Sequence, residues 1–115
     1  MDMTKYTVQE EQMEWLNTQT FMELGVSESK VHVKKVREQD FEDGVGEVVT
    51  KPVVELSLET NGQEYAWVLN KTNTQLLIER YGPNSLEWIG KAFKLRLERV
   101  NYRGTMTNGI RVAQE

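Results

Sequence analysis

Cysteine is absent from this chain of 115 residues, and histidine occurs only once, as His32. The first absence excludes disulfides and thiolate chemistry. The second argues against a zinc site, because such sites draw on several histidine and cysteine ligands. No apolar run approaches the roughly 18 residues of a transmembrane helix. No apolar stretch follows the first charged residues, so we expect no signal peptide. These absences predict a cytosolic protein.

Negative charge is concentrated at the N-terminus, although the whole chain carries a formal net charge of only −4. Residues 1–28 contain six acidic residues and one lysine, a charge of −5, and the other 12 acidic and 13 basic residues give +1. We therefore divide the chain into an acidic N-terminal arm, residues 1–28, and a barrel domain, residues 29–115. A nearly neutral domain can still present a local basic face, so nucleic-acid binding becomes less expected without being excluded.

The N-terminal arm contains one predicted helix. Thr7 and Glu10 have the spacing of a capping box, and apolar residues follow at Met13, Trp15 and Leu16. We therefore predict a helix over residues 8–17. The arm either packs on the domain or serves as an acidic binding element for a partner protein, and both alternatives stay open.

Alternation of apolar and polar side chains predicts five strands, at residues 30–36, 53–59, 65–69, 93–97 and 110–112. The first strand slips out of phase at Lys34 and Lys35, which indicates a β-bulge. Residues 38–47 are predicted to form a loop. An asparagine–glycine pair occurs at residues 61–62 and again at 108–109. Both pairs predict a tight turn, and the first suits a type I′ hairpin, whose two central residues need positive φ.

A helix is predicted over residues 74–81, between the third and fourth strands. Asn73 or Thr72 is its expected N-cap, and Gly82 occupies the position of the C-terminal glycine. The segment Asn70-Lys71-Thr72-Asn73 is interpreted as a strand-to-helix connector. A ligand-binding loop is the alternative, because two amides and a lysine lie beside an aromatic strand.

This order of elements predicts an all-β fold with one or two short helices. Five strands with a helix between the third and fourth are typical of an OB-like barrel, here with an N-terminal helical arm. Closing the sheet removes its exposed edges. The helix is then expected to plug one end of the barrel through Leu76, Leu77 and Tyr81.

Part of the chain, roughly residues 30–112, resembles a group of small, mostly uncharacterised phage and prophage proteins. The resemblance rests on Trp67-Val68-Leu69-Asn70-Lys71-Thr72-Asn73, Tyr81-Gly82, Trp88-Ile89-Gly90-Lys91 and Gly109-Ile110-Arg111-Val112. It implies a compact β-barrel of bacteriophage or prophage origin, and hence the cytoplasm of a bacterial host cell. It implies no catalytic residues and no defined activity.

Tyr65 and Trp67 are candidate stacking residues for single-stranded nucleic acid, because every base offers a π-face to an aromatic ring. They share one face of the third predicted strand. That face is either the barrel interior or the outer surface on which OB-folds bind ligands. The apolar residues between and after them leave both interpretations open.

Lys34, Lys35, Lys94 and Arg96 are candidate phosphate contacts, because the first and fourth strands are neighbours in an OB-like barrel. A solvated face partly neutralised by carboxylates explains the same residues equally well. The loop at residues 38–47 argues against nucleic acid, because its five carboxylates repel phosphate.

Two functions therefore compete. The first is single-stranded nucleic acid binding by a phage-derived OB-like module. The second is a protein-interaction or assembly role without nucleic-acid binding, in which the acidic arm contacts a phage or host protein. Neither requires a cofactor, a metal or a membrane. No phosphate-binding glycine loop is present, and His32 has no evident nucleophile partner, so we predict that the protein is not an enzyme.

Overall fold

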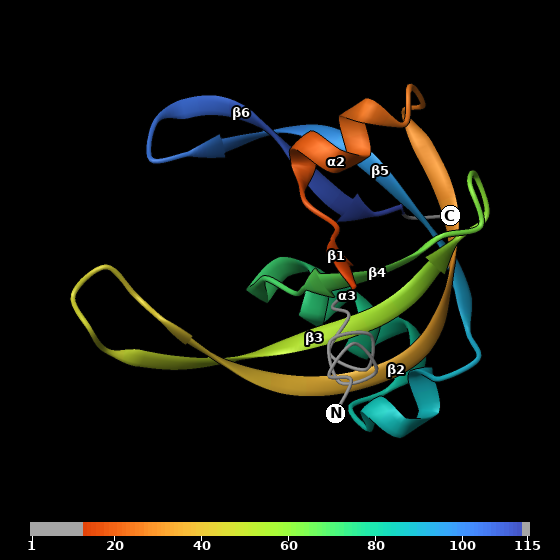
Figure 1. Ribbon diagram of the computed structural model, residues 1–115, viewed down its shortest axis with the longest axis horizontal. Coiled ribbons are helices and arrows are strands. Elements are labelled where there is room, and N and C mark those ends of the chain that lie inside the picture. Colours follow the sequence, from red (N-terminus) through yellow and green to blue (C-terminus); the bar gives the residue numbers. More distant parts are fainter. Residues whose placement is uncertain (1–12, 114–115) are drawn as a thin grey trace, which may run out of the picture.

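The computed structural model describes residues 13–113, most of which lie in one strongly curled sheet (Figure 1). Its strands are β1 (Glu14–Trp15), β2 (Glu28–Glu42), β3 (Val48–Leu58), β4 (Glu64–Val68), β5 (Ala92–Tyr102) and β6 (Thr105–Val112). The helices are α2 (Thr18–Glu23), α3 (Lys71–Tyr81) and the 3-10 turn η1 (Ser85–Trp88). The strand order is β1-β4-β3-β2-β5-β6. The predicted all-β, barrel-like fold is confirmed, but the predicted count of five strands is wrong, because β1 adds a sixth.

The predicted helix over residues 8–17 is wrong in its described part, and residues 8–12 lie outside the described range. Glu14 and Trp15 pair in parallel with β4, and the Leu16 N–H continues this pairing to the Ala66 carbonyl at 2.8 Å. The helix starts only at Thr18, because the Asn17 side chain caps α2 by accepting from the Thr20 N–H. Pairing with a distant strand edge thus overrides the local helical pattern.

The loop predicted over residues 38–47 is wrong for residues 38–42, because β2 and β3 stay paired as far as Glu42 and Val48, and is confirmed for residues 43–47. Only a short turn joins them, and the Asp43 carboxylate stabilises it by accepting from the N–H groups of Val45 and Glu47. Polar residues form strand here because they alternate along a ribbon that projects beyond the core. The predicted bulge is confirmed by a register shift between Val33 and Lys35.

The two asparagine–glycine pairs behave differently. The first lies in the β3–β4 connection as predicted, but only Gly62 has positive φ (71°), so the turn is not type I′. The second prediction is wrong, because Asn108 and Gly109 lie inside β6, opposite Arg99 and Glu98. The turn between β5 and β6 falls at residues 103–104 instead, where both residues have positive φ.

Helix α3 begins earlier than predicted, because its N-cap is Asn70, whose side chain accepts from the Asn73 N–H at 2.8 Å. Gly82 ends the helix as predicted, with φ 94° and its N–H bonded to the Ile78 carbonyl. Leu77 is fully buried, whereas Leu76 and Tyr81 are partly buried against the core. The helix therefore contributes an apolar face to the barrel interior.

One core fills the concave side of the sheet, and it includes residues assigned to the arm. Leu16 and Phe21 are buried in the same cluster as Val31, Leu56 and Leu95. The described part of the segment before residue 28 therefore packs on the barrel. Among residues 13–113 no helix is long and apolar enough to cross a membrane.

Candidate binding cleft

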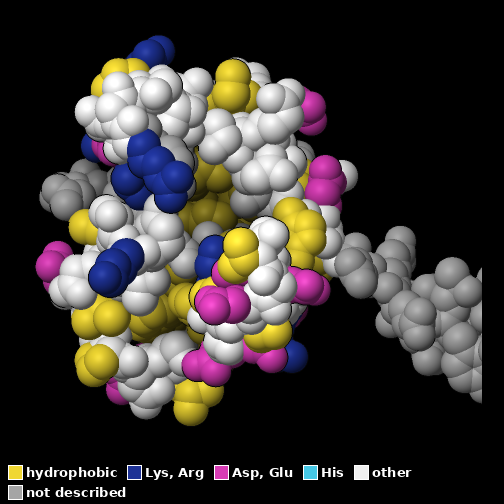
Figure 2. Space-filling view, turned by 90° about the vertical axis from the view of Figure 1, so that its left-hand side faces the viewer, with side chains coloured by type: hydrophobic (Ala, Val, Ile, Leu, Met, Phe, Trp, Pro, Cys, Tyr) yellow, Lys and Arg dark blue, Asp and Glu magenta, His cyan; other side chains and the backbone are white. Residues whose placement is uncertain are grey.

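Two hairpins project from the same side of the protein, β2–β3 and β5–β6 (Figure 1). Figure 2 looks at this side and shows a hollow between them with hydrophobic side chains on its floor. Asp and Glu side chains gather on one side of the hollow, and Lys and Arg side chains on the other. The curled sheet is therefore open on this side of the protein.

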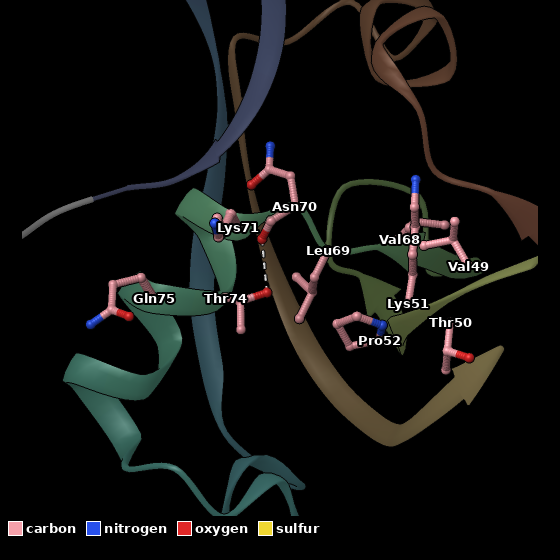
Figure 3. A pocket seen from close by; sticks show the side chains of 10 residues that line it. All are labelled: Val49, Thr50, Lys51, Pro52, Val68, Leu69, Asn70, Lys71, Thr74 and Gln75. Atoms are coloured by element: carbon pink, nitrogen blue, oxygen red, sulfur yellow. Dashed lines mark hydrogen bonds between the residues drawn. The ribbon is translucent and has the colours of Figure 1, made fainter. Parts of the chain in front are cut away.

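A cleft between β3 and α3, here called the main cleft, has a volume of about 720 Å³. Its residues come from β3, from the end of β4 and from the first turns of α3: Val49, Thr50, Lys51, Pro52, Val68, Leu69, Asn70, Lys71, Thr74 and Gln75. Figure 3 shows Thr74 and Gln75 on one wall, the β3 residues on the other, and Leu69 between them. This volume lies within the common range for ligand-binding pockets, about 300–1,000 Å³.

The β4–α3 junction shapes the cleft. The Leu69 N–H donates to the Pro52 carbonyl at 3.0 Å, which is the last bond between the two chain segments. Asn70 then turns the chain into the helix, and its carbonyl accepts from the Thr74 hydroxyl at 2.8 Å. Asn70 thus connects strand and helix, as the first interpretation proposed, whereas Lys71 already belongs to α3, and both residues line the cleft.

The β3 wall belongs to a strongly acidic hairpin. Residues 38–51, here called the acidic ribbon, contain five acidic residues and one lysine: Glu38, Asp40, Glu42, Asp43, Glu47 and Lys51. Of the acidic side chains, Asp40 accepts from the Thr50 hydroxyl at 2.5 Å and Asp43 holds the turn. Apolar side chains are exposed beside them, with Val45 82% and Val48 66% accessible. The ribbon combines negative charge with exposed apolar surface.

The predicted stacking residues, Tyr65 and Trp67, are both buried in the core, with 2% and 4% of their surfaces exposed. The Tyr65 hydroxyl is held by Asn61 and Gln63. Trp67 lines a smaller cleft of about 340 Å³ between β1, α3 and β6. Neither ring is presented on an open outer surface, so of the two interpretations the interior one describes this structure.

The predicted basic residues do not form one uniform stripe. Lys94 lies opposite Lys30 and forms an ion pair with Glu28 at 3.2 Å, and Arg96 forms an ion pair with Glu98. Lys34 and Lys35 lie beyond the last residue pair of β2 and β5, and both are exposed. All four lie apart from the residues that line the main cleft.

The cleft residues of β3 were missed because residues 48–52 fell between the predicted loop, 38–47, and the predicted strand, 53–59, and were assigned to neither. Pro52 is the residue from which this part of the strand could have been predicted. Proline cannot donate to a strand ladder and therefore occurs in strands mainly at sheet edges. The proline at position 52 is therefore consistent with a strand that continues through it and has one unpaired edge.

Comparison with known proteins adds no relative from which a role could be transferred. No protein-family model matches the chain, and no curated protein matches it.

Proposed function

We propose that this chain is an OB-like binding module whose main cleft takes a polypeptide ligand. Strands β4-β3-β2-β5-β6, with α3 between β4 and β5, have the order expected of an OB-fold. The curled sheet supports this assignment. Similarity of fold alone does not identify the ligand. The class of ligand is therefore inferred from the residues around the cleft.

The acidic ribbon is the reason why we propose a polypeptide ligand and not a nucleic acid. A phosphate backbone is bound by lysine and arginine, and carboxylates repel it. One wall of the main cleft belongs to a hairpin with five carboxylates and one lysine; Lys51 lines the cleft, and the carboxylates lie elsewhere on the hairpin. Exposed Val48 and Val49 offer apolar contact on the same hairpin, which suits a protein surface.

We include a phage or prophage origin in this proposal, and its only support is the sequence resemblance. The partner would then be a phage or host protein. The acidic residues before Met13 offer such a partner a second contact, and they lie outside the described residues.

Single-stranded nucleic acid binding is the second candidate. The observation in its favour is that Lys30, Lys34 and Lys35 are all exposed on β2, and no described residue forms an ion pair with them. Such a row can track phosphates without using the main cleft.

Selection from a library of short random peptides, followed by calorimetric titration, tests the first proposal. We expect enriched peptides to bind the wild-type chain and to bind Val49→Asn about tenfold more weakly, because Val49 lines the cleft and loses apolar contact. Val45→Asn is the matched control, since Val45 is exposed on the same hairpin outside the cleft lining. Failure to enrich any peptide would refute the proposal.

Titration of labelled oligo-dT at about 50 and 200 mM salt tests the second candidate, because phosphate contacts give a steep salt dependence over this range. Binding that weakens with salt, and weakens further in Lys34→Ala/Lys35→Ala, would support it. The Lys94→Ala/Arg96→Ala variant distinguishes the β5 cations from those of β2.

A further inference from the structure

We propose that the main cleft binds an extended, basic segment of a partner protein as an added strand on the open edge of β3. This inference rests on the proposed polypeptide-binding function and specifies its geometry and partner chemistry. It follows from the backbone of β3, from the room beside it and from its charge.

Strand β3 extends beyond the end of its neighbour β4. Strand β4 pairs with β3 only as far as Val68 opposite Val53, and the Leu69 N–H adds a final bond to Pro52. The chain then enters α3. Residues 48–51 of β3 continue with β2 on one side only, so an incoming segment would occupy the place that β4 vacates.

The backbone of this edge offers its hydrogen bonds to the cleft. The Pro52 carbonyl points away from β2, toward Leu69, and groups two residues apart point the same way along a strand. The N–H and C=O groups of Thr50 and Val48 therefore face the cleft. No residue within 13–113 supplies a hydrogen bond to them. The close side-chain contact of Asp40 and Thr50 agrees with this register, because it is typical of non-hydrogen-bonded pairs.

The cleft has room for such a strand. Neighbouring strands lie about 4.8 Å apart, and the cleft of about 720 Å³ separates this edge from Lys71, Thr74 and Gln75 of α3. Val49, Val68 and Leu69 provide apolar contacts for alternate side chains of the ligand. Main-chain pairing would supply affinity and these contacts would supply specificity, as in known cases of strand addition.

The charge around the main cleft indicates which kind of segment it binds. The charged side chains that line the cleft are Lys51 and Lys71. The acidic ribbon and Lys71 together nevertheless contain five acidic and two basic side chains, so the net negative charge around the cleft favours a basic segment over an acidic one. A second copy of this chain is disfavoured, because symmetric pairing of two β3 edges would bring two acidic ribbons together.

An alternating lysine–valine peptide is the probe, with a glutamate–valine peptide of the same length as its control. We expect the basic peptide alone to bind, and the Thr50 amide to gain protection from hydrogen exchange by NMR. Thr50→Pro should weaken binding about tenfold, because it removes the N–H that faces the cleft. Thr50→Val keeps this N–H and should lose much less affinity than Thr50→Pro.

The outcomes separate this inference from the function on which it rests. Peptides that bind the cleft without protecting the Thr50 amide would overturn strand addition while leaving a polypeptide-binding module. Preference for the glutamate–valine peptide would overturn the basic partner. If sedimentation analysis shows a dimer, and Thr50→Pro dissociates it into monomers, a second copy of this chain occupies the edge. If Thr50→Pro fails to fold, amide protection in the wild-type chain still decides.

Discussion

The side chain of Asn73, in helix α3, forms a strand-like pair with the backbone at Val112. Its Oδ1 accepts from the Val112 N–H at 3.0 Å, and its Nδ2 donates to the neighbouring Ile110 carbonyl at 2.9 Å. Asn73 is 1% exposed. One amide thus satisfies two backbone groups on the outer edge of β6, where no described strand pairs.

Replacing Asn73 with leucine should therefore destabilise the fold strongly. The change keeps the size of the side chain but leaves one buried N–H and one buried C=O without a partner, at about 2–5 kcal/mol in total. Urea denaturation measures this loss. Thr72→Leu, at an exposed position of the same helix turn, should change the free energy of unfolding by less than about 0.5 kcal/mol. Equal stability of the two variants would contradict the pairing.

The N-terminal segment should contribute to stability through Phe21, which is fully buried although it precedes the predicted domain. Phe21→Ala removes a large core side chain and should cost about 3–5 kcal/mol. Met22→Ala is the adjacent control, because Met22 is 46% exposed. A small effect of Phe21→Ala in thermal or urea unfolding would show that the segment is an independent arm.

The β5–β6 turn should require glycine at position 104, where φ is 82°. Gly104→Ala places a Cβ in the left-handed region and should destabilise by about 1–2 kcal/mol. Gly44→Ala, in the β2–β3 turn, is the matched control. Its φ is not positive and nothing lies within 4 Å of the added Cβ, so stability should stay the same or rise by about 0.5 kcal/mol. Chemical denaturation of both variants checks the difference.

Two ion pairs should differ in strength according to their exposure. Arg37 Nε lies 2.7 Å from Glu55 Oε2, with 31% and 17% of the side chains exposed. The Lys94–Glu28 pair is 53% and 42% exposed. Double-mutant cycles should give about 1 kcal/mol for the first pair and less than about 0.5 kcal/mol for the second. A strong Lys94–Glu28 coupling would contradict this order and would also mean that Lys94 is less available to an anionic ligand.

Short-range signals predicted the elements whose hydrogen bonds are local. Gly82 ends α3 as expected, and the bulge in β2 falls where the alternation slips. The asparagine–glycine pairs mark the limit of such signals. The pair at residues 61–62 lies in a connection, whereas Asn108 and Gly109 are held in β6 by pairing with β5. A dipeptide permits a turn, but strand register decides whether the turn forms there.

The candidate site shows the same division. The sequence singled out Asn70 and Lys71 as part of a possible ligand loop, because polar residues cluster there, and both residues line the cleft. It missed Val49 and Thr50, because the one local signal, Pro52, is compatible with an unpaired strand edge but does not say that β4 ends beside it. It also could not place Tyr65 and Trp67, since a strand with apolar residues on both faces has no pattern that separates interior from exterior.

By itself the sequence determined the all-β, barrel-like class, the position of the helix between two strand-forming halves and the accumulation of acidic residues in one hairpin. These features depend on side-chain alternation, capping and composition, which act over a few residues. Only the tertiary structure decided that Glu14 and Trp15 form a parallel strand, that Asn73 serves the edge of β6, and that β3 keeps an open edge in a cleft. Each of these depends on which backbone groups remain unpaired after distant segments meet.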